Sequence, residues 1–245
     1  EPRNIGPRNP WLVCVGLFCI YTGFWGFYAA CNIPIFDLGP EYGLGDGVTF
    51  YTATNIYVTP TTLSGITMNF LMSLSGGLLA GYWVSKGDPF WTYSGGLAGI
   101  ITASAGNDLY HPIQSMIIAG IGTYIAYKMH YWVERKFKID DAVGAVAVHG
   151  YAGVVGLIIC GFVLWGYPSS GYDGLGYAAI NPVGMIIGAF IMFVVLGFIP
   201  GYVIAKILHA AGKLRIPREV ELAGLDYNIL ESAKKDEKAV ASANR

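Results

Sequence analysis

One histidine lies inside a stretch of sequence that is long enough to cross a lipid bilayer. His149 occurs in the run DDAVGAVAVHGYAGVVGLIICGFVLW, which begins with Asp140 and Asp141 and contains no other acid, base or histidine. An ionisable side chain is costly in hydrocarbon, so its presence in such a segment indicates a functional site. The other interpretation is a neutral imidazole that bonds to a neighbouring helix and serves only packing. The run alone leaves both interpretations open.

The position of His149 separates it from the other histidines. It follows Asp141 by eight residues, which is ~12 Å along a helix that crosses a membrane core ~30 Å thick. His111 is expected at an outer helix end, and His130 and His209 at inner helix ends. These side chains could not converge on one ion, and no Walker, H-E-x-x-H, nucleophile-elbow or dinucleotide motif is present. We therefore expect no enzyme, no metal and no cofactor.

The composition identifies the class of protein. Of the 245 residues, 54% are hydrophobic and 13% are charged, and the mean hydropathy is +0.49. A soluble domain carries about 25% charged residues, so these values predict an integral membrane protein. The net charge of -1 leaves no basic surface for phosphate groups, which excludes nucleic acid as a partner.

Apolar runs of about 20 residues predict an all-α, polytopic membrane helix bundle with six transmembrane helices. The runs are residues 11–31, 63–84, 90–105, 112–132, 142–165 and 182–208. We expect three regions: a cytoplasmic N-terminal segment, a transmembrane bundle with one long outer loop, and a cytoplasmic C-terminal tail. Their bounds are residues 1–10, residues 11–211 with the loop at 32–62, and residues 212–245.

The distribution of basic residues predicts the orientation of these helices. All 15 Lys and Arg residues fall on one side of the six-helix layout or at the helix ends of that side. The opposite loops, at residues 32–62, 106–111 and 166–181, contain none. By the positive-inside rule both termini of this chain are expected in the cytoplasm, with the bundle in the cell (inner) membrane.

Glycine is concentrated in the predicted helices rather than in the loops. Many of the 34 glycines occur within apolar runs, where they recur at spacings of three and four residues, as at Gly77, Gly81 and Gly95, Gly99. Such faces allow helix backbones to approach closely in lipid, so we predict a tight bundle. The four cysteines lie within these runs or at one end and form no C-x-x-C pattern, which indicates packing residues.

The acidic residues restrict the kind of transport. Apart from Asp108 and the Asp140-Asp141 pair at span ends, none of the 16 Asp and Glu residues is expected within a membrane core. Cation carriers place carboxylates near the midplane, so a coupled cation carrier is disfavoured. A narrow apolar path with one imidazole would suit a small neutral or transiently deprotonated solute.

Four motifs, in the same order along the chain, resemble the Amt/Mep/Rh ammonium transporter family. The two acids followed by His149-Gly150 resemble its pore-histidine signature, and residues 6–30 resemble the helix that opens its second half. The segment SGGLAGI at residues 94–100 resembles its glycine-rich helix, and IPREVELAGLD at residues 216–226 resembles its cytoplasmic tail motif. The resemblance covers nearly the whole chain. It implies the C-terminal half of the fold, that is, the second five-helix repeat and the final helix.

The resemblance also implies roles for individual residues. His149 matches one member of a twin-histidine pair in the pore, and Phe27 matches the gate ring of the second half, although its aromatic ring alone would equally suit packing. Cys31 stands where many relatives have a serine that helps to bind ammonium. The remaining matches are structural or regulatory: Asp140, Asp141, Gly150, Gly224 and Asp226.

Three functions from different classes are compatible with these observations. The first is a channel-like transporter of ammonium or ammonia, in which this chain supplies the C-terminal half of the pore. The resemblance then implies a complementary N-terminal half in the same or a separate chain, a homotrimer in membrane lipid, and a PII-type regulator at the tail. The second is a non-conducting structural or accessory subunit of a larger membrane complex. The third, which we rank lowest, is a cofactor-bearing subunit of a membrane enzyme.

Overall fold

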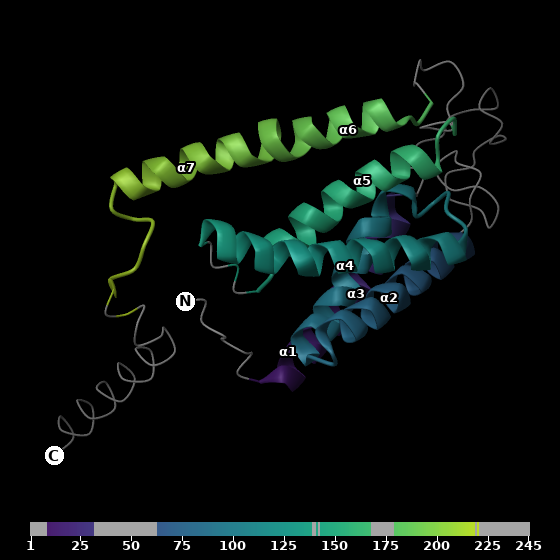
Figure 1. The fold of residues 1–245 in the computed structure, drawn as a ribbon, viewed down its shortest axis with the longest axis horizontal. Helices are drawn as coiled ribbons and strands as arrows, with labels where there is room; N and C mark the ends of the chain where they lie inside the picture. Colours follow the sequence, from purple (N-terminus) through teal and green to yellow (C-terminus); the bar gives the residue numbers. More distant parts are fainter. Residues whose placement is uncertain are drawn as a thin grey trace. The chain divides into compact units, whose positions relative to one another are not determined.

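The elements of the described chain are helices. The computed structural model describes residues 9–31, 63–138, 141, 143–167, 179–218 and 220, with only the backbone at 30 and 31. In chain order the elements are α1 (Pro10–Cys31), α2 (Leu63–Ser85), α3 (Pro89–Ala103), the 3-10 turn η2 (Ser104–Gly106), α4 (Pro112–Phe137), the π-helical segment η3 (Val146–Tyr151), α5 (Ala152–Val163), α6 (Pro182–Phe190), the π-helical segment η4 (Ile191–Phe198) and α7 (Ile199–Ala210) (Figure 1). This confirms the all-α prediction.

Each of the six predicted segments is helical, and four candidate membrane spans meet the requirements of length and apolar composition. These are Pro10–Ala29, Leu63–Ser85, Val146–Val163 and Pro182–Ala210. Helix α3 has 15 residues, which is ~22 Å and shorter than a membrane core of ~30 Å. The second half of α4 carries Lys128, Glu134, Arg135 and Lys136.

The chain divides into two compact units, Glu1–Phe193 and Val194–Arg245. The first contains α1 to α6 and is organised around α3. Helices α2, α3 and α4 pack against one another, α1 lies on α2 and α3, and α5 contacts α3, α4 and α6. The second unit contains α7, whose described residues are almost all exposed.

Three of the helices begin with a proline that follows a polar capping residue. Asp88, His111 and Asn181 each precede a proline and accept a backbone amide of the first helical turn, at Trp91, Ile113 and Gly184. At His111 the capping is reciprocal, because the Gln114 side chain accepts the His111 amide at 2.9 Å. The first amides of a helix lack partners within it, and proline has no amide to satisfy. These pairs therefore set the starts of α3, α4 and α6.

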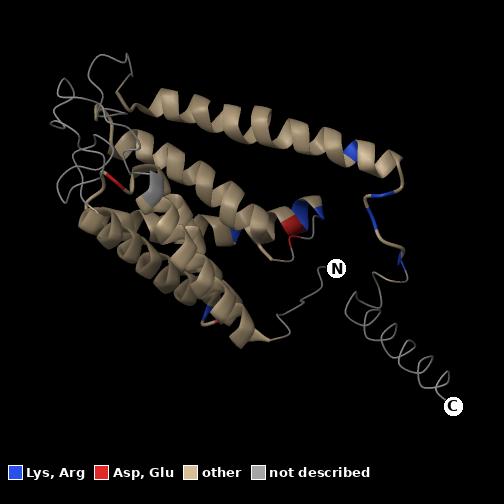
Figure 2. Cartoon of the chain, turned by 180° about the vertical axis from the view of Figure 1, so that it is seen from behind, with Lys and Arg blue, Asp and Glu red and all other residues tan. Residues whose placement is uncertain are grey.

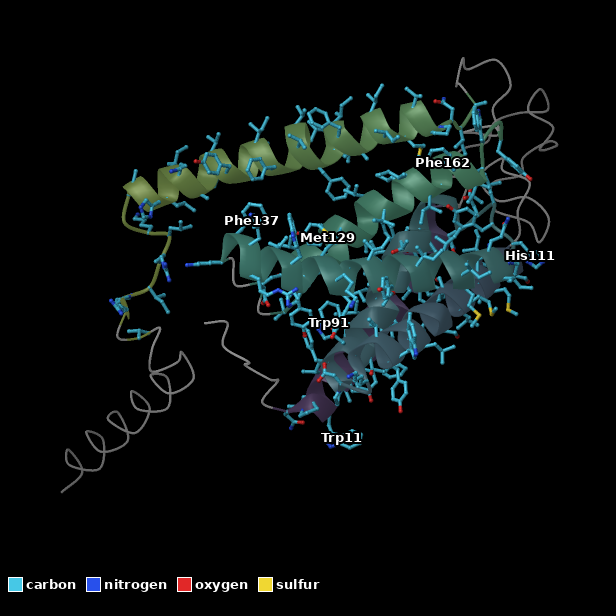
Figure 3. The ribbon with its side chains drawn as sticks, in the orientation of Figure 1. Trp11, Trp91, His111, Met129, Phe137 and Phe162 are labelled. Carbon is cyan, nitrogen blue, oxygen red and sulfur yellow. The ribbon has the colours of Figure 1, made fainter. Side chains whose placement is uncertain are left out.

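The interior of the first unit combines apolar contacts with polar groups that join helices. Trp91 is 2% exposed, whereas Trp11 at the start of α1 is 79% exposed, and Figure 3 shows Trp91 among the helices and Trp11 directed away from them. The Thr123 hydroxyl on α4 donates to the Gly95 carbonyl on α3 at 3.0 Å. Charged residues lie mainly towards the helix ends (Figure 2), which is the distribution expected of helices in lipid.

Close approach of α2 and α3 depends on glycine. A Cβ placed on Gly77 would collide with the carbonyl of Gly95, and one placed on Gly99 would collide with the Ser73 carbonyl and the Gly77 backbone. A Cβ on Gly156 would likewise meet the backbone of Thr102, where α5 crosses α3. The predicted tight packing through small residues is confirmed at these crossings.

We expect Gly77→Ala to destabilise the bundle, because its methyl group would meet backbone atoms that cannot rotate away. Overpacking of this kind costs about 1–3 kcal/mol of unfolding free energy. Gly16→Ala is the matched control, since an added Cβ there meets nothing within 4 Å and alanine favours helix by up to about 1 kcal/mol. Thermal unfolding in detergent measures both variants. Equal melting temperatures for the two would contradict the close contact.

Candidate functional site

His149 lies in the π-helical segment η3, which leads directly into α5. Its neighbours Ala147 and Val148 are buried, and Val148 belongs to the apolar core together with Ala98 and Ile100 of α3. His149 itself is exposed on the surface of this chain. The core therefore anchors the backbone immediately before His149, while the imidazole is exposed.

The π-helical geometry distinguishes this turn from the helices around it. A π-helix has i→i+5 bonding, is rare, and occurs frequently at functional sites. Gly150 follows His149 within this segment, and a Cβ placed there would meet only the Val146 Cγ1 atom, at an ordinary 3.7 Å. The described part of the chain thus has room for a Cβ at Gly150, the residue that follows the exposed His149.

The Asp141 carboxylate caps the segment. Its Oδ1 accepts the Val146 amide and its Oδ2 accepts the Ala147 amide, each at 3.2 Å. The Asp141 carbonyl also accepts the Gly144 amide at 2.8 Å. Asp141 therefore satisfies amides that have no acceptor within the helix, and its negative charge lies at the positive end of the helix dipole.

The helix that carries His149 starts later than the sequence predicted. The predicted span begins at residue 142, whereas Gly144 adopts φ of +68° and continuous helical structure follows it. Left-handed backbone suits glycine and interrupts a right-handed helix. The span ends at Val163 and not at 165, because residues 164–166 form a turn.

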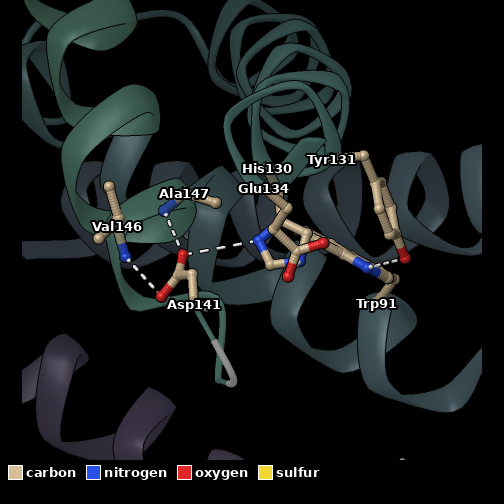
Figure 4. A network of polar contacts seen from close by, with 7 residues as sticks. All are labelled: Trp91, His130, Tyr131, Glu134, Asp141, Val146 and Ala147. Carbon is tan, nitrogen blue, oxygen red and sulfur yellow. Dashed lines mark hydrogen bonds and ion pairs between the residues drawn. The ribbon is translucent and has the colours of Figure 1, made fainter. Parts of the chain in front are cut away.

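Asp141 also contacts the buried His130, which the sequence predicts at an inner helix end. The His130 Nδ1 atom lies 3.5 Å from Asp141 Oδ2, and its Nε2 lies 3.3 Å from Glu134 Oε1, with His130 only 7% exposed. The His130 ring packs edge-on against Trp91, whose Nε1 donates to the Tyr131 hydroxyl at 3.0 Å. Figure 4 shows these side chains between α4, α3 and the start of η3.

One signal in the sequence could have indicated part of this cluster. His130 and Glu134 are four residues apart, a spacing that brings side chains together on a helix. The contact with Asp141 joins the end of one helix to the start of the next, and no periodicity encodes it.

The other predicted site residues lie apart from this cluster or outside the described residues. Phe27 on α1 is 59% exposed and packs against the rings of Phe24 and Tyr28. Both α1 and η3 pack on α3, so Phe27 and His149 project from two helices that share a neighbour. Cys31 ends α1 but its side chain is not described, and Asp140, Gly224 and Asp226 lie outside the described residues.

A second set of polar contacts lies where α2 meets the segment between α3 and α4. The Asn69 amide nitrogen donates to the carbonyls of Asn107 and Tyr110 at 2.8 Å and 2.6 Å. Burial raises the pKa of the neighbouring Asp108 carboxyl, and the backbone amides of Asp108 and Leu109 oppose that shift by donating to it.

Among the residues that the structure describes, no three His, Cys, Asp or Glu side chains are placed to hold a metal ion.

The family model and the curated relatives that match this chain agree with one another. The model of the Ammonium Transporter Family matches residues 1–235. The ammonium transporter Amt1 of Methanocaldococcus jannaschii is 30% identical over 235 residues, which cover 95% of this chain and 52% of that protein. An ammonium transporter of Bacillus subtilis is 30% identical over 225 residues, which cover 91% and 51%. The chain therefore spans about half the length of the curated relatives it matches.

A solved structure shows the same fold. The structure titled Sensor Amt Protein superimposes with a TM-score of 0.66 at 21% sequence identity. The match covers 92% of this chain and 50% of the solved chain.

We expect substitutions of Asp141 to loosen the first turn of η3 in a graded way. Asp141→Ala removes both acceptors and should cost about 1–2 kcal/mol. Asp141→Asn keeps one carbonyl oxygen and should cost less. Hydrogen exchange at the Val146 and Ala147 amides measures the change, with α2 amides as internal reference. Unchanged exchange in Asp141→Ala would show that the carboxylate does not hold this turn.

We expect Asp108→Asn to raise the melting temperature at pH 7. Because the pKa of Asp108 is raised on folding, the folded chain binds this proton more tightly, and stability falls as pH rises above the ordinary carboxyl pKa of about 3.9. The gain from Asp108→Asn should shrink as the pH is lowered towards that value. Melting curves at several pH values test this, and a shift of the same size at every pH would contradict it.

Proposed function

The chain belongs to the ammonium transporter family, and from that premise we propose that it supplies the C-terminal half of a path for ammonium or ammonia across the cell (inner) membrane. The observation that carries this proposal is His149, an imidazole exposed on the surface of a candidate membrane span. Lipid is a poor environment for such a group. A complementary half that covers the His149 face would enclose it within protein.

The share of each relative that this chain matches supports a complementary half, in the same or a separate chain. The match covers about half of each curated relative named above. Transporters built from two inverted repeats bind their substrate between the repeats, so a residue of the path would be exposed when only one repeat is present. His149 and Phe27 are both exposed in this chain, as residues of such a path would be. In this arrangement Phe27 narrows the path and Cys31 contributes to its outer end.

The chemistry of the path favours a neutral solute in its interior. Between Val146 and Val163 His149 is the sole acid, base or histidine, so no carboxylate of this span balances a cation. Ammonium would lose a proton before entry, and ammonia would cross beside the imidazole. The imidazole can accept or donate a hydrogen bond and can relay a proton. The proton that ammonium loses would cross separately.

The surrounding arrangement follows from the same proposal. Six helices cross the membrane with both termini of this chain in the cytoplasm, as the distribution of Lys and Arg supports. The assembly is a homotrimer, and a PII-type regulator binds the tail at the motif that contains Gly224 and Asp226. Asp140 and Asp141 start the helix, and Gly150 leaves room beside His149.

We expect His149→Ala to reduce uptake of labelled methylammonium by about tenfold or more, the loss expected when a group that contacts the solute is removed. The measurement uses the complete natural assembly that contains this chain. His209→Ala is the matched control, because His209 is an exposed histidine at the end of α7, and it should transport normally. Unchanged uptake in His149→Ala would remove His149 from the path, and no uptake by the unmodified assembly would favour a structural subunit.

A further inference from the structure

The buried histidine of α4 has more contacts with acids than helix packing requires. Both ring nitrogens of His130 lie within 3.5 Å of a carboxylate oxygen, one on Glu134 and one on Asp141. The His130 Nδ1 atom makes no hydrogen bond within the described structure although it is buried. Asp141 Oδ2, which lies 3.5 Å from His130 Nδ1, also accepts the Ala147 amide.

The two carboxylates match the cationic form of the ring. An ionised carboxylate only accepts hydrogen bonds, and a neutral imidazole has one N–H, so it can donate to only one of the two acids. The imidazolium has an N–H on each nitrogen and can donate to both. Such charge-assisted hydrogen bonds are among the strongest in proteins.

The neighbours of His130 fix the plane of its ring. Trp91 of α3 packs against it with ring centroids 5.1 Å apart, and Tyr131 with centroids 4.9 Å apart. Trp91 is itself held by its hydrogen bond to the Tyr131 hydroxyl. The imidazole therefore presents its nitrogens to Glu134 and Asp141 and cannot easily turn elsewhere.

Asp141 connects the His130 ring to the helix that carries His149. Its two oxygens hold the Val146 and Ala147 amides, and His149 follows Ala147 by two residues in the same π-helical segment. A shift of the carboxylate would shift the turn that aims His149. We propose that His130 is a positioning residue for conduction, which holds Asp141 and through it the turn that bears His149. This inference rests on the function proposed above.

Other polar groups surround His130 and Asp141. On α4 these are Glu134, which faces His130 Nε2, and the Tyr127 and Tyr131 hydroxyls. From α3, the N-terminal cap Asp88 interacts with Tyr131, and from η3, Tyr151 interacts with Asp141. Groups from α3, α4 and η3 therefore meet around His130 and Asp141.

The test uses His130→Phe, which keeps a ring without donors, and His130→Gln, which keeps one donor without a titratable charge. Hydrogen exchange at the Val146 and Ala147 amides should accelerate by about tenfold in His130→Phe, as expected when a charge-assisted contact is lost. Exchange in α2 should not change. Methylammonium uptake by the complete assembly should fall by a similar factor in His130→Phe and by less in His130→Gln.

Rescue by the conservative variant separates positioning from packing. The amide of His130→Gln keeps a donor for one of the two carboxylates, so its uptake and its exchange at Val146 and Ala147 should lie closer to those of the unmodified protein than the values of His130→Phe do. His209→Gln is the matched control and should leave both measurements unchanged. Equal losses in His130→Gln and His130→Phe, or unchanged exchange at Val146 and Ala147 in His130→Phe, would overturn the proposal.

A double substitution tests whether His130 acts through Asp141. In an Asp141→Asn background His130→Phe should change uptake and exchange by less than about twofold, since residues of one network do not contribute additively. Full multiplication of the two effects would overturn the inference. If the unmodified assembly transports nothing, the function proposed above fails, and amide exchange alone still decides whether His130 holds this turn.

Discussion

The first turn of the His149 helix depends on one carboxylate. The amides at the start of a helix have no acceptor within it, and in a membrane protein unsatisfied backbone groups are especially costly. Asp141 accepts two of them, at Val146 and Ala147. The left-handed Gly144 makes the preceding backbone turn, so that Asp141 lies beneath the helix it caps. The position of His149 follows from this short segment.

Close packing holds the rest of the bundle in a form that can support the segment. Glycine faces bring α2, α3 and α5 within backbone contact, and Ala147 and Val148 insert into the core beside α3. His149, one residue further on, is exposed. The same turn thus faces the interior on one side and open surface on the other. That arrangement suits a chain that spans about half the length of the relatives named above.

Long apolar runs predicted the helices within a few residues, because length and hydropathy are local properties. The predicted run at residues 63–84 corresponds to α2, Leu63–Ser85. The start of the His149 helix was predicted too early. The positive φ of Gly144 interrupts the helix there, and a hydropathy pattern does not indicate which glycine adopts such a φ. Spacing and resemblance predicted a site at His149 and Asp141, and the structure places the Asp141 carboxylate on the first turn of the helix that carries His149. The role of His130 depends on a contact between two helices, and the π-helical turn has no periodic signature, so neither was predicted.

The central claim is that protein, and not lipid, covers His149 in the complete membrane assembly. The most direct measurement is an experimental structure of that assembly in a lipid bilayer, at a resolution that distinguishes side chains from acyl chains around residue 149. The account predicts helices of a complementary half opposite the imidazole, with a narrow passage between them. Acyl chains packed against the His149 ring, with no protein facing it, would contradict the account.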